Sequence, residues 1–188
     1  MEFSVMTMSM SGRPEGRLRI VLLTLRIAAL LVAVALPIAL TSFWLFVDPS
    51  GVSALVPLPG KPQILLGNFE RIAGLSLSML PVGILIFGLI RLRAYLAALL
   101  QGAIFSGATS RALKDFALAV GASVLARPII SAVLSVVLTW SAPPGQQTLS
   151  FSLSLDTVLL LIFAATIGLA AWTMQLATAI AEENSRFV

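Results

Sequence analysis

The residues best suited to do chemistry lie in one apolar stretch, residues 116–140. Its only formal charge is Arg127, and hydroxyl side chains follow around it at a spacing of four: Ser123, Ser131, Ser135 and Thr139. On an α-helix this spacing makes one slowly drifting polar stripe, which is costly to expose to lipid and is expected to face other helices. An arginine inside a membrane costs about 2.5–3.5 kcal/mol on insertion scales, so another group must offset it.

Two interpretations of Arg127 remain open at this stage. In the first, Arg127 is structural, and it is satisfied by neighbouring hydroxyls, by water and by the carbonyl of Val124 that Pro128 leaves free. In the second, Arg127 binds the carboxylate of a protein partner or an anionic ligand, because ionisable residues inside a membrane are candidates for function. The candidate binding set is Arg127, Ser123, Ser131 and Ser135.

A carboxylate of the same chain would be the simplest partner for Arg127, yet none is predicted at its depth. The sequence places Glu70 and Asp156 near the outer ends of the second and fourth apolar runs, and Asp115 near the inner end of the third. The arginine is therefore expected to form an incomplete pair.

The composition is that of a membrane protein without catalytic groups. Of the 188 residues, 59% are hydrophobic and only 11% are charged, against about 25% charged in soluble domains. The chain has no cysteine and no histidine, which excludes disulfides, thiolate chemistry, the usual zinc sites and the commonest general base. No paired carboxylates share a depth and no phosphate loop is present. We therefore expect no enzyme, no catalytic residues, no metal site and no cofactor.

Charge-poor runs predict four membrane-spanning helices, near residues 20–47, 72–100, 111–140 and 155–183. A tail of residues 1–19 precedes a single membrane domain of residues 20–188. The basic residues gather on one side of the spans: Arg13, Arg17, Arg19, Arg91, Arg93, Arg111, Lys114 and Arg186. By the positive-inside bias, both termini and the connector between the second and third spans are cytoplasmic. Topology explains the net charge of +4 better than direct binding of nucleic acid does.

The predicted fold is all-α, an integral membrane four-helix bundle with small extracytoplasmic loops. Two segments in these loops suggest a short β cap. Residues 147–153 alternate apolar and polar side chains, and residues 63–66 form a short apolar piece between a proline and a glycine. A lone strand cannot satisfy its own backbone, so the two segments are expected to pair.

Charged residues at the cytoplasmic side have two open interpretations. The connector residues are topological determinants, or they contact anionic headgroups or an acidic protein partner. They are Arg91, Arg93, Arg111 and Lys114. Glu182 and Glu183 are a solvated helix end or a contact for a cytoplasmic partner. The expected partners are membrane lipids together with another protein or further copies of this chain.

Three short motifs in residues 90–188 carry a resemblance to a known family. They are QGAIFS (101–106), RALKD (111–115) and the ending AIAEEN with a final FV (179–188). In these motifs the chain resembles the domain of unknown function 2975 family of small four-span bacterial membrane proteins. Residues 107–109 depart from the family, where acidic residues are expected. The resemblance implies a bacterial inner membrane location and no established activity. Members often lie beside small helix-turn-helix regulators, which implies a regulatory partner rather than a substrate.

Two functions are consistent with these features. The first is a non-enzymatic integral membrane protein that acts as a regulatory or accessory subunit of a membrane-associated partner. The second is a subunit of a small transporter or channel, with a polar path along the third helix. An intramembrane enzyme fits least, because histidine, cysteine and buried carboxylates are missing.

Overall fold

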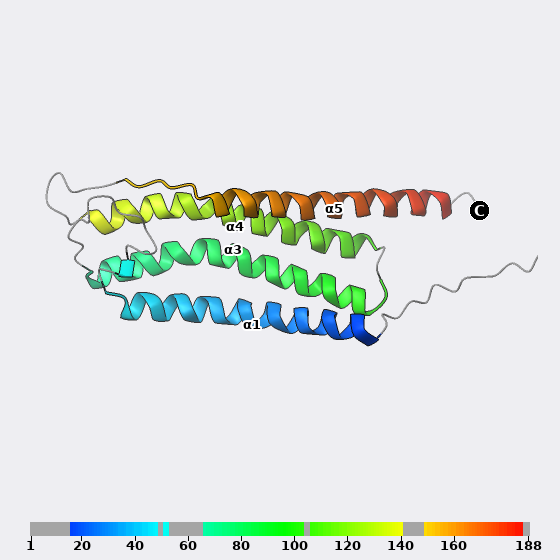
Figure 1. Cartoon of the computed structure of the whole chain (residues 1–188), viewed down its shortest axis with the longest axis horizontal. Coiled ribbons are helices and arrows are strands. Elements are labelled where there is room, and N and C mark those ends of the chain that lie inside the picture. Colours follow the sequence, from blue (N-terminus) through cyan, green and yellow to red (C-terminus); the bar gives the residue numbers. More distant parts are fainter. Residues whose placement is uncertain (1–15, 49–50, 53–65, 104–105, 141–148, 186–188) are drawn as a thin grey trace, which may run out of the picture.

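The structure, a computed structural model, describes residues 16–48, 51–52, 66–103, 106–140 and 149–185. Four long helices dominate these ranges (Figure 1): α1 (Gly16–Phe46), α3 (Asn68–Leu100), α4 (Gly107–Thr139) and α5 (Leu155–Ser185). Each is long and apolar enough to cross a membrane. The predicted all-α, four-span membrane fold is confirmed.

The first three helices begin four residues before the predicted spans, because their first turns are polar and extend each helix beyond its apolar run. At α4 an N-cap residue stabilises this polar first turn. Ser106 accepts a hydrogen bond from the backbone N–H of Thr109 at 3.1 Å, which satisfies one of the unpaired donors of the first turn.

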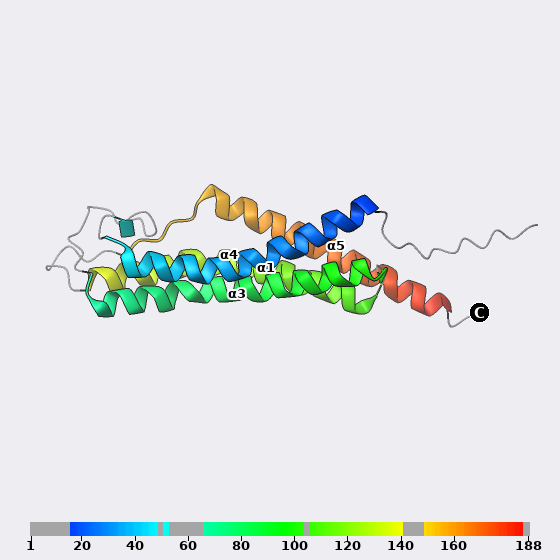
Figure 2. The ribbon, with the colours of Figure 1, turned by 90° about the horizontal axis from the view of Figure 1, so that it is seen from below.

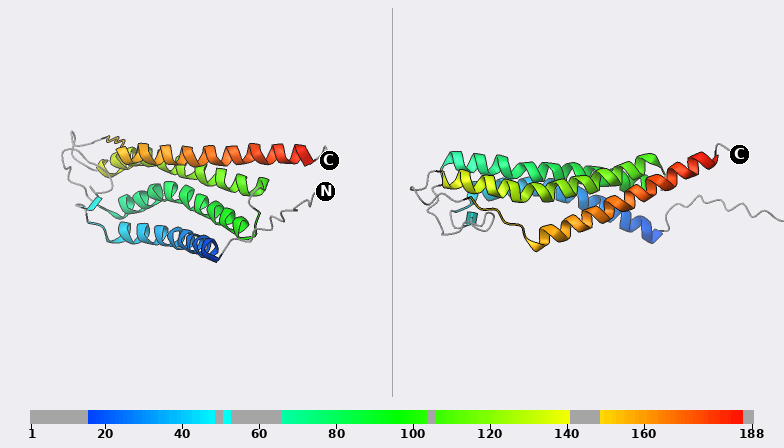
Figure 3. Two further views of the ribbon diagram at one scale, coloured as in Figure 1. Left: turned by 45° about the vertical axis from the view of Figure 1, so that its right-hand side comes forward. Right: turned by 90° about the horizontal axis from the view of Figure 1, so that it is seen from above.

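The helices are arranged in the order α1, α3, α4, α5, and each packs against its neighbours in this series. Among these four helices, the two outer ones, α1 and α5, do not pack closely against each other. Helix α5 crosses α4 at an angle (Figures 2 and 3), and its end reaches beyond the ends of the other helices (Figure 1). The bundle is therefore open between α1 and α5.

The chain enters α5 through an extended segment, residues 149–154, which runs back along α4 (Figure 1). This segment forms no strand, so the predicted β cap is wrong for its described part, and residues 63–65 and 147–148 lie outside the described residues. The physical reason is that the N–H of Ser150 donates to the Oγ of Ser135 on α4, at 2.9 Å, instead of to a second strand. The alternation of side chains turns Leu149, Phe151 and Leu153 outward.

Helices α1 and α3 are held together where Trp44 of α1 packs against Gly74 of α3. Trp44 is 1% exposed, and its Nε1–H donates to the Oγ of Ser78 at 3.3 Å. Its ring lies directly over Gly74, where a Cβ atom would come within 2.2 Å of the ring. Small residues allow such close approach between membrane helices, which associate mainly through van der Waals packing.

Arg71 of α3 reinforces the same contact at the end of α1. Its guanidinium donates to the carbonyls of Trp44 and Leu45, both at 2.9 Å, and to that of Val47 at 3.1 Å. The last carbonyls of a helix lack donors within the helix, so Arg71 acts as a cap supplied by another helix.

Three of the helices contain a proline in their interior: Pro37 in α1, Pro81 in α3 and Pro128 in α4. Each proline removes one backbone N–H, so the carbonyl four residues earlier has no donor within its helix. In membrane proteins, neighbouring side chains or water satisfy such carbonyls.

Candidate functional site

The structure divides the predicted polar stripe of α4 into two parts. Ser123, Ser135 and Thr139 are at most 1% exposed and lie within the helix packing. Arg127 and Ser131 line a cavity instead. The predicted binding set of four residues is therefore not one continuous surface: Ser123 and Ser135 are packing residues, and Ser135 positions the extended segment through its bond with Ser150.

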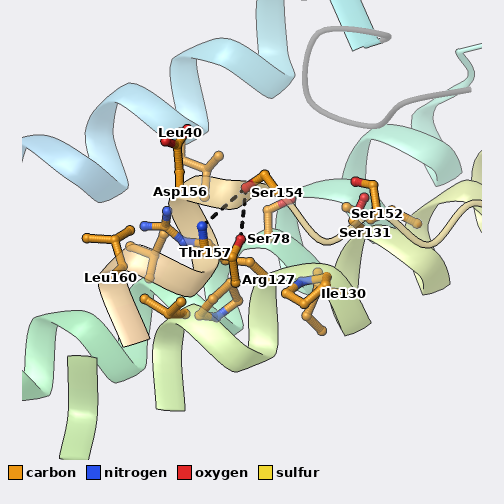
Figure 4. Close-up of a pocket in the computed structure, with 15 residues that line it drawn as sticks. Leu40, Ser78, Arg127, Ile130, Ser131, Ser152, Ser154, Asp156, Thr157 and Leu160 are labelled. Atoms are coloured by element: carbon orange, nitrogen blue, oxygen red, sulfur yellow. Dashed lines mark hydrogen bonds between the residues drawn. The ribbon is translucent and has the colours of Figure 1, made fainter. Parts of the chain in front are cut away.

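The cavity has a volume of about 470 Å³ and is lined by residues from all four long helices (Figure 4). Leu40 of α1 and the prolines of α3 and α4 form part of its apolar wall. Its polar side chains are Ser78, Arg127, Ser131, Ser152, Ser154, Asp156 and Thr157. Arg127 and Asp156 are exposed, so the cavity is accessible from outside the bundle.

Asp156 shares this cavity with Arg127, which corrects the prediction that no carboxylate of the chain lies at the depth of the arginine. The physical reason is the extended segment. This segment follows the C-terminal part of α4, so that α5 begins part-way along α4 (Figure 1). Within the described part of the chain, the side chains of Arg127 and Asp156 make no hydrogen bond and no ion pair. The cavity therefore presents a cation and an anion that are both available to an occupant.

Two further groups in or beside the cavity need polar partners. The Oγ of Ser131 is buried and has no hydrogen-bond partner among the described residues. The backbone of residues 151–153 makes no hydrogen bond within the described ranges either. Non-helical backbone at membrane depth is tolerated where it is buried in protein or lines a water-filled cavity. The cavity therefore offers an occupant several polar groups within a mostly apolar wall.

The connector residues at the other end of the bundle differ from one another. Arg91 pairs with Asp115 of α4, with 2.8 Å between Nε and Oδ2, and both side chains are about one-third exposed. The Nε of Arg93 is buried without a partner in the described part of the chain. Arg111 and Lys114 line a second cavity, of about 370 Å³, between α4 and α5. Of the four predicted contacts, Arg91 is thus already engaged within the chain.

Glu182 and Glu183 lie in the last turns of α5, but their side chains lie outside the described residues. No group of three or more potential metal ligands occurs among the residues that the structure describes.

We compared the chain with family models, with curated proteins and with solved structures. No match was found. The resemblance to the domain of unknown function 2975 family stays a prediction that rests on the three motifs alone. The functional interpretation consequently depends on the geometry of the chain itself.

Proposed function

We propose that this protein is a non-enzymatic regulatory or accessory subunit of a membrane-associated partner, and that the cavity around Arg127 receives that partner. The observation that supports the proposal is an arginine side chain that no described residue binds. Arg127 lies in the interior of a membrane-spanning helix, faces an accessible cavity and has no hydrogen-bond partner among the described residues. A carboxylate from a partner's membrane segment would offset the cost of placing the arginine there.

Asp156 defines the chemistry of the partner further. Because this carboxylate faces the same cavity, the partner is expected to present a hydrogen-bond donor or a cation beside its own carboxylate. Arg127 belongs to α4 and Asp156 to α5, so a partner that contacts both would also hold these two helices together. Such a contact would complete the side of the bundle where α1 and α5 do not meet.

The alternative, a transporter or channel subunit with a polar path along α4, has one observation in its favour. The cavity offers both charges and several hydroxyls to a solute. A path that followed the whole stripe would require Ser123 and Ser135 to be accessible, whereas both are buried in the helix packing. We therefore favour the accessory subunit.

Photo-crosslinking in native membranes tests the proposed partner directly. A photoreactive amino acid in place of Leu160, which lines the cavity, should form an adduct with a second protein. The control position is Ile162, which is 59% exposed and lies on nearly the opposite face of α5. Adducts from the Leu160 position alone would support the proposal. Absence of any protein adduct at Leu160, together with solute flux through the purified protein, would support the transporter instead.

We also propose that both termini are cytoplasmic, in a bacterial inner membrane. The start of α1, the connector between α3 and α4 and the end of α5 lie at one end of the bundle (Figure 1), and the basic residues concentrate there. The positive-inside bias assigns this end to the cytoplasm. The bacterial membrane is implied by the family resemblance.

Reporter fusions check this topology. Alkaline phosphatase fused at Gly60 or at Gln146 should be active, because both positions are predicted to be outside the cytoplasm, and green fluorescent protein fused at Gly107 should fluoresce. Phosphatase activity at Gly107, or fluorescence from a fusion at Gly60, would contradict the proposed orientation.

A further inference from the structure

We infer that the second cavity, between α4 and α5, binds the headgroup of an anionic phospholipid. The cavity measures about 370 Å³ and is formed by the first turns of α4 and the last described side chains of α5. Two cations, Arg111 and Lys114, line it, and no acidic residue is found among its lining residues. This site is separate from the cavity around Arg127 and does not depend on the function proposed above.

The two cations have donors that no described residue occupies. Arg91 already has Asp115, and Arg71 already caps α1. Arg111, by contrast, uses only its Nε, which donates to a backbone carbonyl of its own helix at 2.8 Å, so its terminal nitrogens remain available. The side chain of Lys114 makes no hydrogen bond within the described part of the chain. An arginine and a lysine that line one cavity, with no acidic side chain among its described lining residues, match a phosphate group.

The hydroxyls of the cavity match the rest of a glycerol headgroup. Ser110 and Thr178 are buried, and each donates its hydroxyl proton to a backbone carbonyl four residues earlier, that of the N-cap Ser106 and that of Met174. Their oxygens can therefore only accept, and they suit the hydroxyl groups of a phosphatidylglycerol better than they suit the phosphate.

The surroundings of the cavity favour a lipid over a free phosphate. Leu118 lies one turn deeper than Lys114 on the same face of α4 and is 61% exposed. Trp172 of α5 lies about one turn deeper than Gln175 of the cavity and is 58% exposed. These side chains give acyl chains an apolar surface directly beside the cations. Basic cavities between membrane helices bind anionic headgroups in this manner.

Native mass spectrometry of the purified full-length protein can test the site. Phosphatidylglycerol and phosphatidylcholine with the same acyl chains are titrated separately. We expect tighter binding of phosphatidylglycerol and a loss of about fivefold in its affinity for each basic residue that is neutralised, hence more than tenfold for R111Q/K114Q. The matched control, R17Q/R19Q, removes two exposed cations at the same end of the bundle and should leave the affinity unchanged.

Two results would overturn the inference. One is equal weakening by R111Q/K114Q and R17Q/R19Q, which would indicate attraction to surface charge in general. The other is displacement of phosphatidylglycerol by glycerol 3-phosphate at comparable concentrations, which would assign the cavity to a soluble phosphate. The single variant K114Q removes no side-chain hydrogen bond in the described chain, so it serves as a check in case the double variant misfolds. Its affinity for phosphatidylglycerol should fall by about fivefold.

Discussion

Arg127→Leu is expected to release the partner while the bundle stays folded. A charge-assisted hydrogen bond contributes about 1.5–3 kcal/mol, so its loss should lower retention of the partner during purification by roughly ten- to a hundredfold. The isolated protein should be as stable as the wild type or more stable, because removal of an unpaired charge also removes its desolvation cost. Both quantities can be measured on one preparation, by quantitative co-purification and by thermal unfolding.

Two control variants make this prediction specific. Arg127→Lys should restore retention poorly, because lysine lacks the planar fork that holds a carboxylate through two hydrogen bonds. Arg26→Leu removes an arginine of α1 that does not itself line the cavity, and it should leave retention unchanged. Retention that Arg127→Leu does not alter, with no change in solute flux, would mean that Arg127 is structural.

Gly74→Ala should produce the largest loss of stability of any single-methyl change on α3. The added Cβ would lie 2.2 Å from the ring of Trp44, far inside van der Waals contact. Trp44 cannot easily move aside, since it is buried on all sides and hydrogen-bonded to Ser78. Overpacking of a close-packed core typically costs about 1–3 kcal/mol, and we expect the upper end of that range because the obstructing group is a rigid ring.

The control for Gly74→Ala is Gly83→Ala on the same helix. A Cβ at Gly83 meets no atom within 4 Å, so this variant tests the change from glycine to alanine without a clash. It should be neutral or slightly stabilising, by about 0.5–1 kcal/mol, because alanine is the better helix former. Thermal unfolding in detergent or nanodiscs measures both variants. Equal unfolding temperatures for the two would refute the close packing of Trp44 on Gly74.

The four helices could be predicted because their signal is local. Each apolar run is long enough to span a membrane and is bordered by charged residues or by a loop rich in glycine and proline. Arg127 was found for the same reason, since a charge in such a run stands out, and Ser131 was found because it lies one helical turn from Arg127. The spacing of four then overestimated the extent of the site. Successive residues at this spacing turn by about 40° around a helix, so Ser135 and Thr139 leave the face that carries Arg127. Ser123 stays within about 40° of that face, but it is buried in the helix packing.

Asp156 could not be placed from the sequence, because its position depends on a tertiary contact. Alternating apolar and polar residues, as in 149–154, are typical of a strand or a loop, and this pattern does not indicate where along α4 the segment lies. Here the bond from Ser150 to Ser135 ties the segment to α4, and α5 begins deeper in consequence. One signal was available: residues 149–155 contain no charge, no glycine and no proline, so nothing in them requires a position in water.

The prolines of α1, α3 and α4 have a mechanical consequence. They lie nine, thirteen and eleven residues from the same end of the bundle (37 to 46, 68 to 81 and 128 to 139), or roughly 14–20 Å along the helix axes. Each marks a point where a backbone hydrogen bond is already missing, so a helix can bend there without breaking another. These three positions differ by about one helical turn in depth, so this is the region where the helices would bend most easily. Pro81 and Pro128 line the cavity, so bending there would change its width.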